Sequence, residues 1–195
     1  LVILLKIEIK IMSLALVFTD ADVNFTYDWW TGLCEDETKM NVWLQKLQFT
    51  ELQGYQDNID AAEKYGNGNQ RVDKLLRNTA LDELRHSHLL SDVLNGRGLN
   101  HLSSHVSYFW DKLDAHVVDL ATLCAVFYLG EALAAFRFEV IKHHPSTPDD
   151  VLHFINEALP DEEYHARGFR MHTTDEALST IRLVYDDVVA KMKKT

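Results

Sequence analysis

The segment Asp82-Glu83-Leu84-Arg85-His86 is the most informative part of the sequence for the fold. It places a glutamate and a histidine three residues apart in a stretch with a helical pattern. A second segment, Asp161-Glu162-Glu163-Tyr164-His165, repeats this spacing. Residues three apart on a helix point in the same direction. Each segment therefore offers one oxygen donor and one nitrogen donor on one face of its helix.

The apolar residues around these segments predict that this face is buried. Apolar residues recur every three or four positions around both pairs, and also around two single glutamates, Glu51 and Glu131. The stripes consist of Leu44, Leu47, Tyr55 and Ile59 around Glu51; Val72, Leu76, Thr79, Leu90 and Val93 around Glu83 and His86; Val117, Leu120, Cys124, Phe127, Ala134, Phe138 and Ile141 around Glu131; and Val151, Ile155, Ala158 and Phe169 around Glu162 and His165. We therefore expect all six polar groups to face the core.

Four buried carboxylates require positive charge nearby, because an isolated buried charge is too costly to tolerate. Two histidines do not supply enough charge, whereas two divalent metal ions would balance four carboxylates. The spacing is also symmetric: Glu83 follows Glu51 by 32 residues, and Glu162 follows Glu131 by 31. Two similar antiparallel hairpins around a dinuclear site would produce this near-equality.

Five helices are expected, and they form an all-α, four-helix bundle with one long crossover and an added C-terminal helix. The turn at Gly66-Asn67-Gly68-Asn69, the glycines 96 and 98, and Pro145 separate them. The expected ranges are 37–65, 70–95, 115–143, 148–171 capped by Ser146 or Thr147, and a last helix from a Thr173 or Thr174 cap to about 191. The bundle domain is 37–195 and follows an N-terminal arm, 1–36. Residues 1–11 are interpreted equally well as sequence foreign to the native chain or as an amphipathic strand or arm.

Composition narrows the functional classes. The 195 residues are 47% hydrophobic and carry a net charge of −11, so we expect no nucleic-acid partner and no anionic membrane surface. No run of 18 residues is apolar throughout, which predicts that no helix spans a membrane. Two cysteines, Cys34 and Cys124, are too few for a disulfide framework, which is typical of a cytoplasmic protein.

The ligand pattern resembles the ferritin-like di-iron carboxylate superfamily, over roughly residues 37–171. In that superfamily two helices each give one glutamate and two give Glu-x-x-His. The resemblance implies that the metal ligands are Glu51, Glu83, His86, Glu131, Glu162 and His165. It also implies two iron ions, with manganese or a mixed iron–manganese pair as alternatives. The usual bridging carboxylates would be Glu83 and Glu162.

Finer likeness favours the oxygen-activating branch of that superfamily. Asp82 to His86 is similar to a segment of the multicomponent monooxygenase hydroxylases, and 124–141 with 161–169 is loosely similar to the aldehyde-deformylating oxygenases. In the hydroxylases, Asp and Arg residues equivalent to Asp82, Arg85 and Asp161 orient the histidines. The alternative for Asp82 and Asp161 is that they are solvated helix charges. Tyr55 and Tyr128, one turn from ligands, either contact the site or only pack in the core.

The resemblance implies an enzyme that uses dioxygen to oxidise a small, apolar organic substrate. Hydroxylation, N-oxygenation, desaturation and C–C cleavage all remain open as its reaction. The sequence has no flavin or iron–sulfur motif, so an external electron donor is expected, and a homodimer is compatible with this class. The alternative function is a ferritin-like or rubrerythrin-like protein that oxidises iron or scavenges peroxide.

Overall fold

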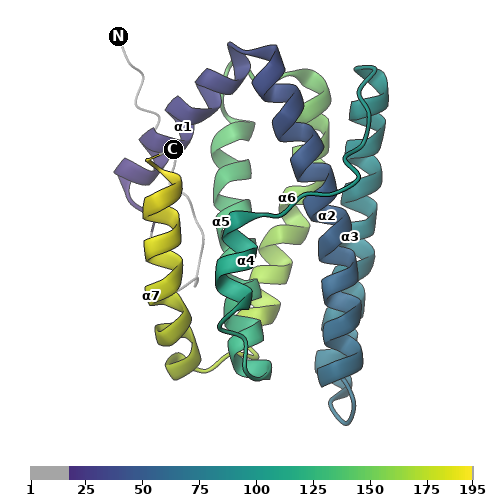
Figure 1. Ribbon diagram of the computed structural model, residues 1–195, viewed down its shortest axis with the longest axis vertical. Helices are drawn as coiled ribbons and strands as arrows, with labels where there is room; N and C mark the ends of the chain where they lie inside the picture. Colours follow the sequence, from purple (N-terminus) through teal and green to yellow (C-terminus); the bar gives the residue numbers. More distant parts are fainter. Residues whose placement is uncertain (1–17, 195) are drawn as a thin grey trace.

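A computed structural model describes residues 18–194, which form seven helices (Figure 1). No strand occurs in that range. The helices are α1 (Asp20–Cys34), α2 (Glu37–Tyr65), α3 (Gln70–Gly96), α4 (Tyr108–Asp114), α5 (Leu120–Lys142), α6 (Asp149–Arg170) and α7 (Asp175–Met192). The all-α expectation is confirmed. Residues 1–11, whose origin was left open above, lie outside the described range.

Two helical hairpins form the centre of the molecule (Figure 1). α2 packs along α3, α5 packs along α6, and α3 contacts α6 between the hairpins. The α2–α3 turn needs Gly68, whose φ of +86° is left-handed and unfavourable for other residues. The crossover 97–119 contains α4 and joins the hairpins, while α7 packs on α4 and α5.

The helix ends follow local capping chemistry, and two predicted starts were wrong. α5 begins at Leu120 and not near 115, because Asp119 caps it and forms a reciprocal pair with Thr122. α6 begins after Pro148, which occupies the N-cap position without a side-chain cap, so neither Ser146 nor Thr147 caps that helix. The Thr147 hydroxyl instead donates to the Ile141 carbonyl (2.6 Å) and accepts from the Trp30 indole (2.8 Å).

The N-terminal region contributes more than an arm. Residues 20–34 form α1, which packs against α5 and α2. Trp30 is fully buried there, and its ring lies edge-on to Trp43 of α2 with centroids 4.9 Å apart. α1 therefore covers one end of the two hairpins.

α5 passes through the middle of the core. By length and composition alone it could cross a membrane, although no run of 18 residues in it is apolar throughout. However, 78% of its most apolar 18-residue window is buried inside the protein. The other helices bury the apolar surface of α5, as expected of the core helix of a bundle.

Two apolar clusters lie on either side of a polar layer. One gathers Leu76 of α3, Phe127 of α5 and Phe169 of α6, and the other gathers Leu44, Leu90 and Phe154. On α2 the buried face runs through Gln48, Glu51 and Asn58, whereas Leu47, Tyr55 and Ile59 of the predicted stripe are only half-buried. The observed buried face of α2 is thus rotated around the helix relative to the predicted stripe. Glu51 lies on the predicted face and on the observed one.

Candidate metal centre

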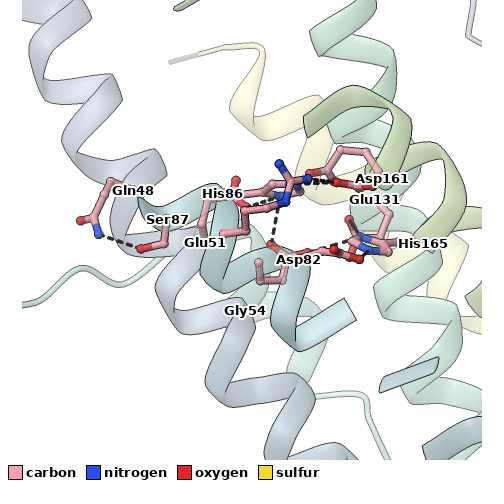
Figure 2. A network of polar contacts seen from close by, with 12 residues as sticks. Gln48, Glu51, Gly54, Asp82, His86, Ser87, Glu131, Asp161 and His165 are labelled. Atoms are coloured by element: carbon pink, nitrogen blue, oxygen red, sulfur yellow. Dashed lines mark hydrogen bonds and ion pairs between the residues drawn. The ribbon is translucent and has the colours of Figure 1, made fainter. Parts of the chain in front are cut away.

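Six acidic and histidine side chains meet in the polar layer between the two apolar clusters. They come from four helices: Glu51 from α2, Glu83 and His86 from α3, Glu131 from α5, and Glu162 and His165 from α6. Each exposes 9% or less of its surface. Figure 2 shows four of them, Glu51, His86, Glu131 and His165, converging from the two hairpins. The structure therefore brings together all six residues that the sequence singled out.

The cluster divides into two groups that share Glu83. One group is Glu51, Glu83, His86 and Glu162, and the other is Glu83, Glu131 and His165; within each group, one donor atom per residue lies within 4.8 Å of all the others. His86 Nδ1 is 3.5 Å from Glu51 Oε2 and 3.4 Å from Glu162 Oε1. His165 Nδ1 is 3.5 Å from Glu83 Oε1 and 4.0 Å from Glu131 Oε2. Two ligand atoms bound to the same metal ion are at most about 4.2 Å apart. The two distances around each histidine therefore suit one ion in each group.

The outer nitrogen of each histidine contacts a carboxylate from the opposite hairpin. His86 Nε2 of α3 lies 3.1 Å from Asp161 Oδ2 of α6, and His165 Nε2 of α6 lies 3.1 Å from Asp82 Oδ2 of α3. A histidine that donates its Nε2 hydrogen this way leaves its Nδ1 lone pair free for a metal. The two contacts cross between the hairpins with the same geometry.

Only one of these aspartates has an arginine partner. The Arg85 guanidinium donates a hydrogen bond to Asp161 and lies 3.7 Å from Glu157. The matching position on α6 is Tyr164, which is 53% exposed. Within residues 18–194, Asp82 forms no ion pair with a lysine or arginine. The two histidines therefore sit in different charge environments.

The charges of the cluster are not balanced by protein groups alone. Burial, reinforced by the neighbouring carboxylates, raises the pKa of Glu83 and of Glu162 well above its ordinary value. Burial also raises the pKa of Glu131 to about 7. Burial opposes ionisation of Glu51, yet hydrogen bonds with His86 and Glu83 and the two histidine charges together outweigh it and lower the Glu51 pKa. Without a metal, several of these acids keep a proton at neutral pH.

The ligand atoms of the cluster suit bound metal ions better than they suit one another as hydrogen-bond partners. The Nδ1 atoms of His86 and His165 and the Oε1 atom of Glu83 are buried and have no hydrogen-bond partner within the described chain. Buried polar atoms are rarely left unpaired, because the cost is about 1–3 kcal/mol each. All three atoms belong to the groups above, so bound metal ions would satisfy them.

A cavity of about 480 Å³ opens beside the cluster, between α2, α5 and the crossover. Glu51, Glu83, Glu131 and Glu162 all line it. Aromatic and aliphatic side chains form most of the remaining wall near the cluster: Trp43, Leu47, Phe49, Trp110, Phe127, Leu133, Ala134, Phe138 and Ile141. The cavity thus joins the metal-binding groups to space for an organic molecule.

Other residues shape the site without a signal in the sequence pattern. Gln48 Nε2 donates to Ser87 Oγ (2.9 Å) and links α2 to α3 one turn before Glu51. Gly54 lies against the Glu83 carboxylate, since a Cβ there would be in van der Waals contact with Oε2 at 3.4 Å. Trp110 packs so closely on Gly130 that a Cβ at that glycine would lie 2.1 Å from the indole.

The two tyrosines next to the ligands occupy different environments. Tyr55 is half-buried and is not among the residues that line the cavity. Tyr128 is fully buried and packs in the apolar cluster around Phe127 and Phe169. Neither side chain lines the space next to the four glutamates.

Comparison of the chain with protein-family models, with curated protein sequences and with solved structures gave no match. The fold and the buried Glu/His cluster are compatible with the superfamily that the sequence pattern resembles, and the cluster could hold a metal ion.

Proposed function

We propose that this protein is a ferritin-like di-iron enzyme that uses dioxygen to oxidise a small, apolar organic substrate. The observation that carries the proposal is the shared wall between metal-binding groups and cavity: all four glutamates of the cluster also line the 480 Å³ cavity. The oxygen and nitrogen donors suit iron, with manganese or a mixed pair as alternatives. An iron pair bound there would supply the electrons and the Lewis acidity for dioxygen reduction.

The protein's own residues hold and orient the centre. Glu83 belongs to both donor groups and would bridge them, while Glu51 with His86 and Glu131 with His165 would complete the two sides. Asp161 and Asp82 hold the histidine rings by their Nε2 hydrogens. This contact fixes each tautomer and aims Nδ1 at the centre.

The apolar part of the cavity wall would position the substrate. Phe127, Leu133, Ala134 and Phe138 extend along α5 on both sides of Glu131. An apolar molecule in this space gains free energy by leaving water, and its position next to Glu131 would place it beside the metals. Electrons come from an external donor, because the sequence carries no flavin or iron–sulfur motif.

Metal uptake and oxygen consumption test the proposal together. The purified chain, reconstituted anaerobically with Fe(II), should bind about two irons and consume oxygen when a reductant is supplied. Glu131→Ala should lose one iron and most of the oxygen consumption. The matched control is Glu63→Ala, an exposed glutamate of α2 outside the site. Binding of no iron, or equal oxygen consumption by Glu131→Ala and the original chain, would contradict the proposal.

The alternative is a protein whose substrate is Fe(II) itself, or peroxide. It is favoured by the acidic side of the cavity, where Asp57, Asp111 and Asp114 lie together. Burial and the charges of Asp57 and Asp111 raise the pKa of Asp114 to about 6, which shows that these carboxylates repel one another and would attract cations. Assembly into a hollow shell, seen by size-exclusion chromatography, with accumulation of ferric mineral would support this alternative over the oxygenase.

A further inference from the structure

One arginine that lines the cavity, Arg137 of α5, forms no ion pair within the described residues, and it also borders a smaller pocket lined by Asp22, Tyr185 and Asp186. Six of the eight arginines form ion pairs with carboxylates: Arg77, Arg85, Arg97, Arg167, Arg170 and Arg182. The two others are Arg71, which is exposed, and Arg137, which is half-buried. Within the described chain, Arg137 forms no hydrogen bond and no ion pair.

The surroundings of Arg137 are mostly apolar. Its guanidinium lies over the Trp29 ring, with Cζ 5.6 Å from the centroid. Trp43, Phe138 and Ile141 line the same cavity. Burial lowers the pKa of the guanidinium, because it removes water from around the charge, and the nearby Tyr185 opposes this shift. A partly buried cation without a partner is costly, and a bound anion would remove that cost.

Side chains of both charges line the cavity. Arg137 and Lys46 contribute positive charge, whereas Asp57, Asp111 and Asp114 contribute negative charge beside other parts of the wall. Arg137 follows Glu131 by six residues, which is about 9 Å along the axis of α5. Ala134 and Phe138 provide apolar wall around this stretch. An elongated molecule with one anionic end would fit this arrangement in a single orientation.

We propose that Arg137 binds the carboxylate of the substrate, which is an apolar carboxylic acid whose hydrocarbon part extends towards Glu131 and the rest of the metal centre. Only the identification of this carboxylic acid as the substrate rests on the proposed function; the carboxylate-binding site does not depend on it. One guanidinium matches one carboxylate with two parallel hydrogen bonds. A phosphate dianion would call for more positive charge than one arginine and one rim lysine provide. The four glutamates at the other end would repel the carboxylate and thereby fix the orientation.

Binding to the metal-free protein tests the site without any turnover. Trp29 and Trp43 provide a fluorescence signal, and octanoate and octanamide are probes of equal length that differ in charge. We expect octanoate to bind at least tenfold more tightly than octanamide at low ionic strength. Arg137→Gln should abolish this preference, and Arg137→Lys should retain part of it. The matched control, Arg77→Gln, removes a paired, exposed arginine of α3 that lines neither pocket, and it should leave the preference unchanged.

The outcomes separate this inference from the proposed function. Equal affinity for the two probes, or an unchanged preference in Arg137→Gln with a native circular-dichroism spectrum, would overturn the carboxylate site. Iron content and oxygen consumption are measured on the same preparations. A preference that depends on Arg137 in a chain that binds no iron would refute the enzyme and keep the carboxylate site. Two irons with oxygen consumption but no preference would do the reverse.

Discussion

The two sides of the metal centre use the same ligand types but place different charges around their histidines. His86 contacts Asp161, which pairs directly with Arg85, whereas His165 contacts Asp82, which forms no direct arginine or lysine pair within residues 18–194 and feels Arg85 only from a distance. Burial opposes protonation of His86, yet Glu51 and Glu162 raise its pKa to about 9. The comparison shows that two similar helical hairpins place their histidines in unequal charge environments.

The largest effect is expected where the two sides meet, at Glu83. Glu83→Ala removes a donor from both groups, so it should lower affinity on both sides, by more than about a hundredfold, and leave well under one iron per chain. Glu51→Ala and Glu131→Ala each remove a donor that belongs to only one group and should leave about one iron. Metal analysis after anaerobic reconstitution measures the difference, with Glu63→Ala as the control. If Glu83→Ala kept as much iron as Glu131→Ala, the shared role of Glu83 would be wrong.

The aspartates that hold the histidines should have the next largest effect. Asp161→Asn and Asp82→Asn each weaken the orientation of one ring and should lower iron affinity on that side by about 10- to 100-fold. Asp161→Asn should cost more, because Arg85 would then lie beside His86 without its carboxylate; Arg85 Nη2 is already 3.5 Å from His86 Nε2. Iron release measured during a titration with a chelator ranks the iron affinities of the two variants. Equal release curves would show that Arg85 does not distinguish the two sides.

Sequence periodicity predicted the buried faces of α3 and α6 well, because every third or fourth residue on a regular helix faces the same neighbour. It could not predict which aspartate serves which histidine. Asp82 precedes Glu83 by one residue and therefore points away from the Glu83 face, towards another helix. Its contact, His165, lies 83 residues away and depends on how α3 packs on α6. Contacts of this kind come from tertiary packing and leave no local pattern.

The same limit applies to α1 and to the cavity. Nothing in the spacing of 20–34 predicts that Trp30 is fully buried against the first turns of α2. The displaced stripe on α2 has a related cause, since Gln48 and Asn58 are buried polar residues that a hydrophobic pattern misses. Arg137 carries no sequence signal either, because its distinction is the absence of a partner in three dimensions.

The pH dependence of stability should reveal the different protonation of the two sides. Glu131 has a pKa of about 7 in the folded chain and an ordinary value of 4.5. Between these pH values the folded state therefore holds a proton on Glu131 that the unfolded state has released. His86 does the same between its ordinary value of 6.5 and about 9. A folded state that binds more protons loses stability as pH rises. The melting temperature of the metal-free protein should therefore fall by about 5 °C from pH 6 to pH 8.

Two further measurements assign this slope to the two sides. Glu131→Gln should remove most of the pH dependence of the melting temperature below about pH 7. The decrease in melting temperature above pH 7, which we assign to His86 on the other side, should remain. Iron binding should remove most of the dependence, because metal replaces the protons. Stability of the metal-free protein that rises from pH 6 to pH 8 would contradict the protonation described here. Exposed Glu63→Gln serves as the control, since its carboxylate lies outside the cluster.

The smallest effect, and the sharpest test of the inequality, is expected from Arg85→Gln. Without the guanidinium, Asp161 would present its full charge to His86, and the ring would become a stronger electron donor. This change favours the oxidised metal on that side and should lower its potential by no more than about 60 mV, the value of a tenfold change for one electron. The two potentials should converge in a redox titration, and stability should fall by only about 0.5–1 kcal/mol, because the pair is partly exposed.

The converse variant, Tyr164→Arg, would place an arginine at the matching position of α6. Tyr164 is 53% exposed, so the substitution does not disturb the core. If the new guanidinium reaches Asp82, it should raise the potential on the His165 side, again bringing the two sides closer. Arg167→Gln, which removes an exposed pair with Glu163, is the control and should change neither potential. A shift of both potentials by the same amount in Arg85→Gln would mean that the arginine acts through the overall field of the protein; a shift confined to one side would assign the inequality to the Arg85–Asp161–His86 contact.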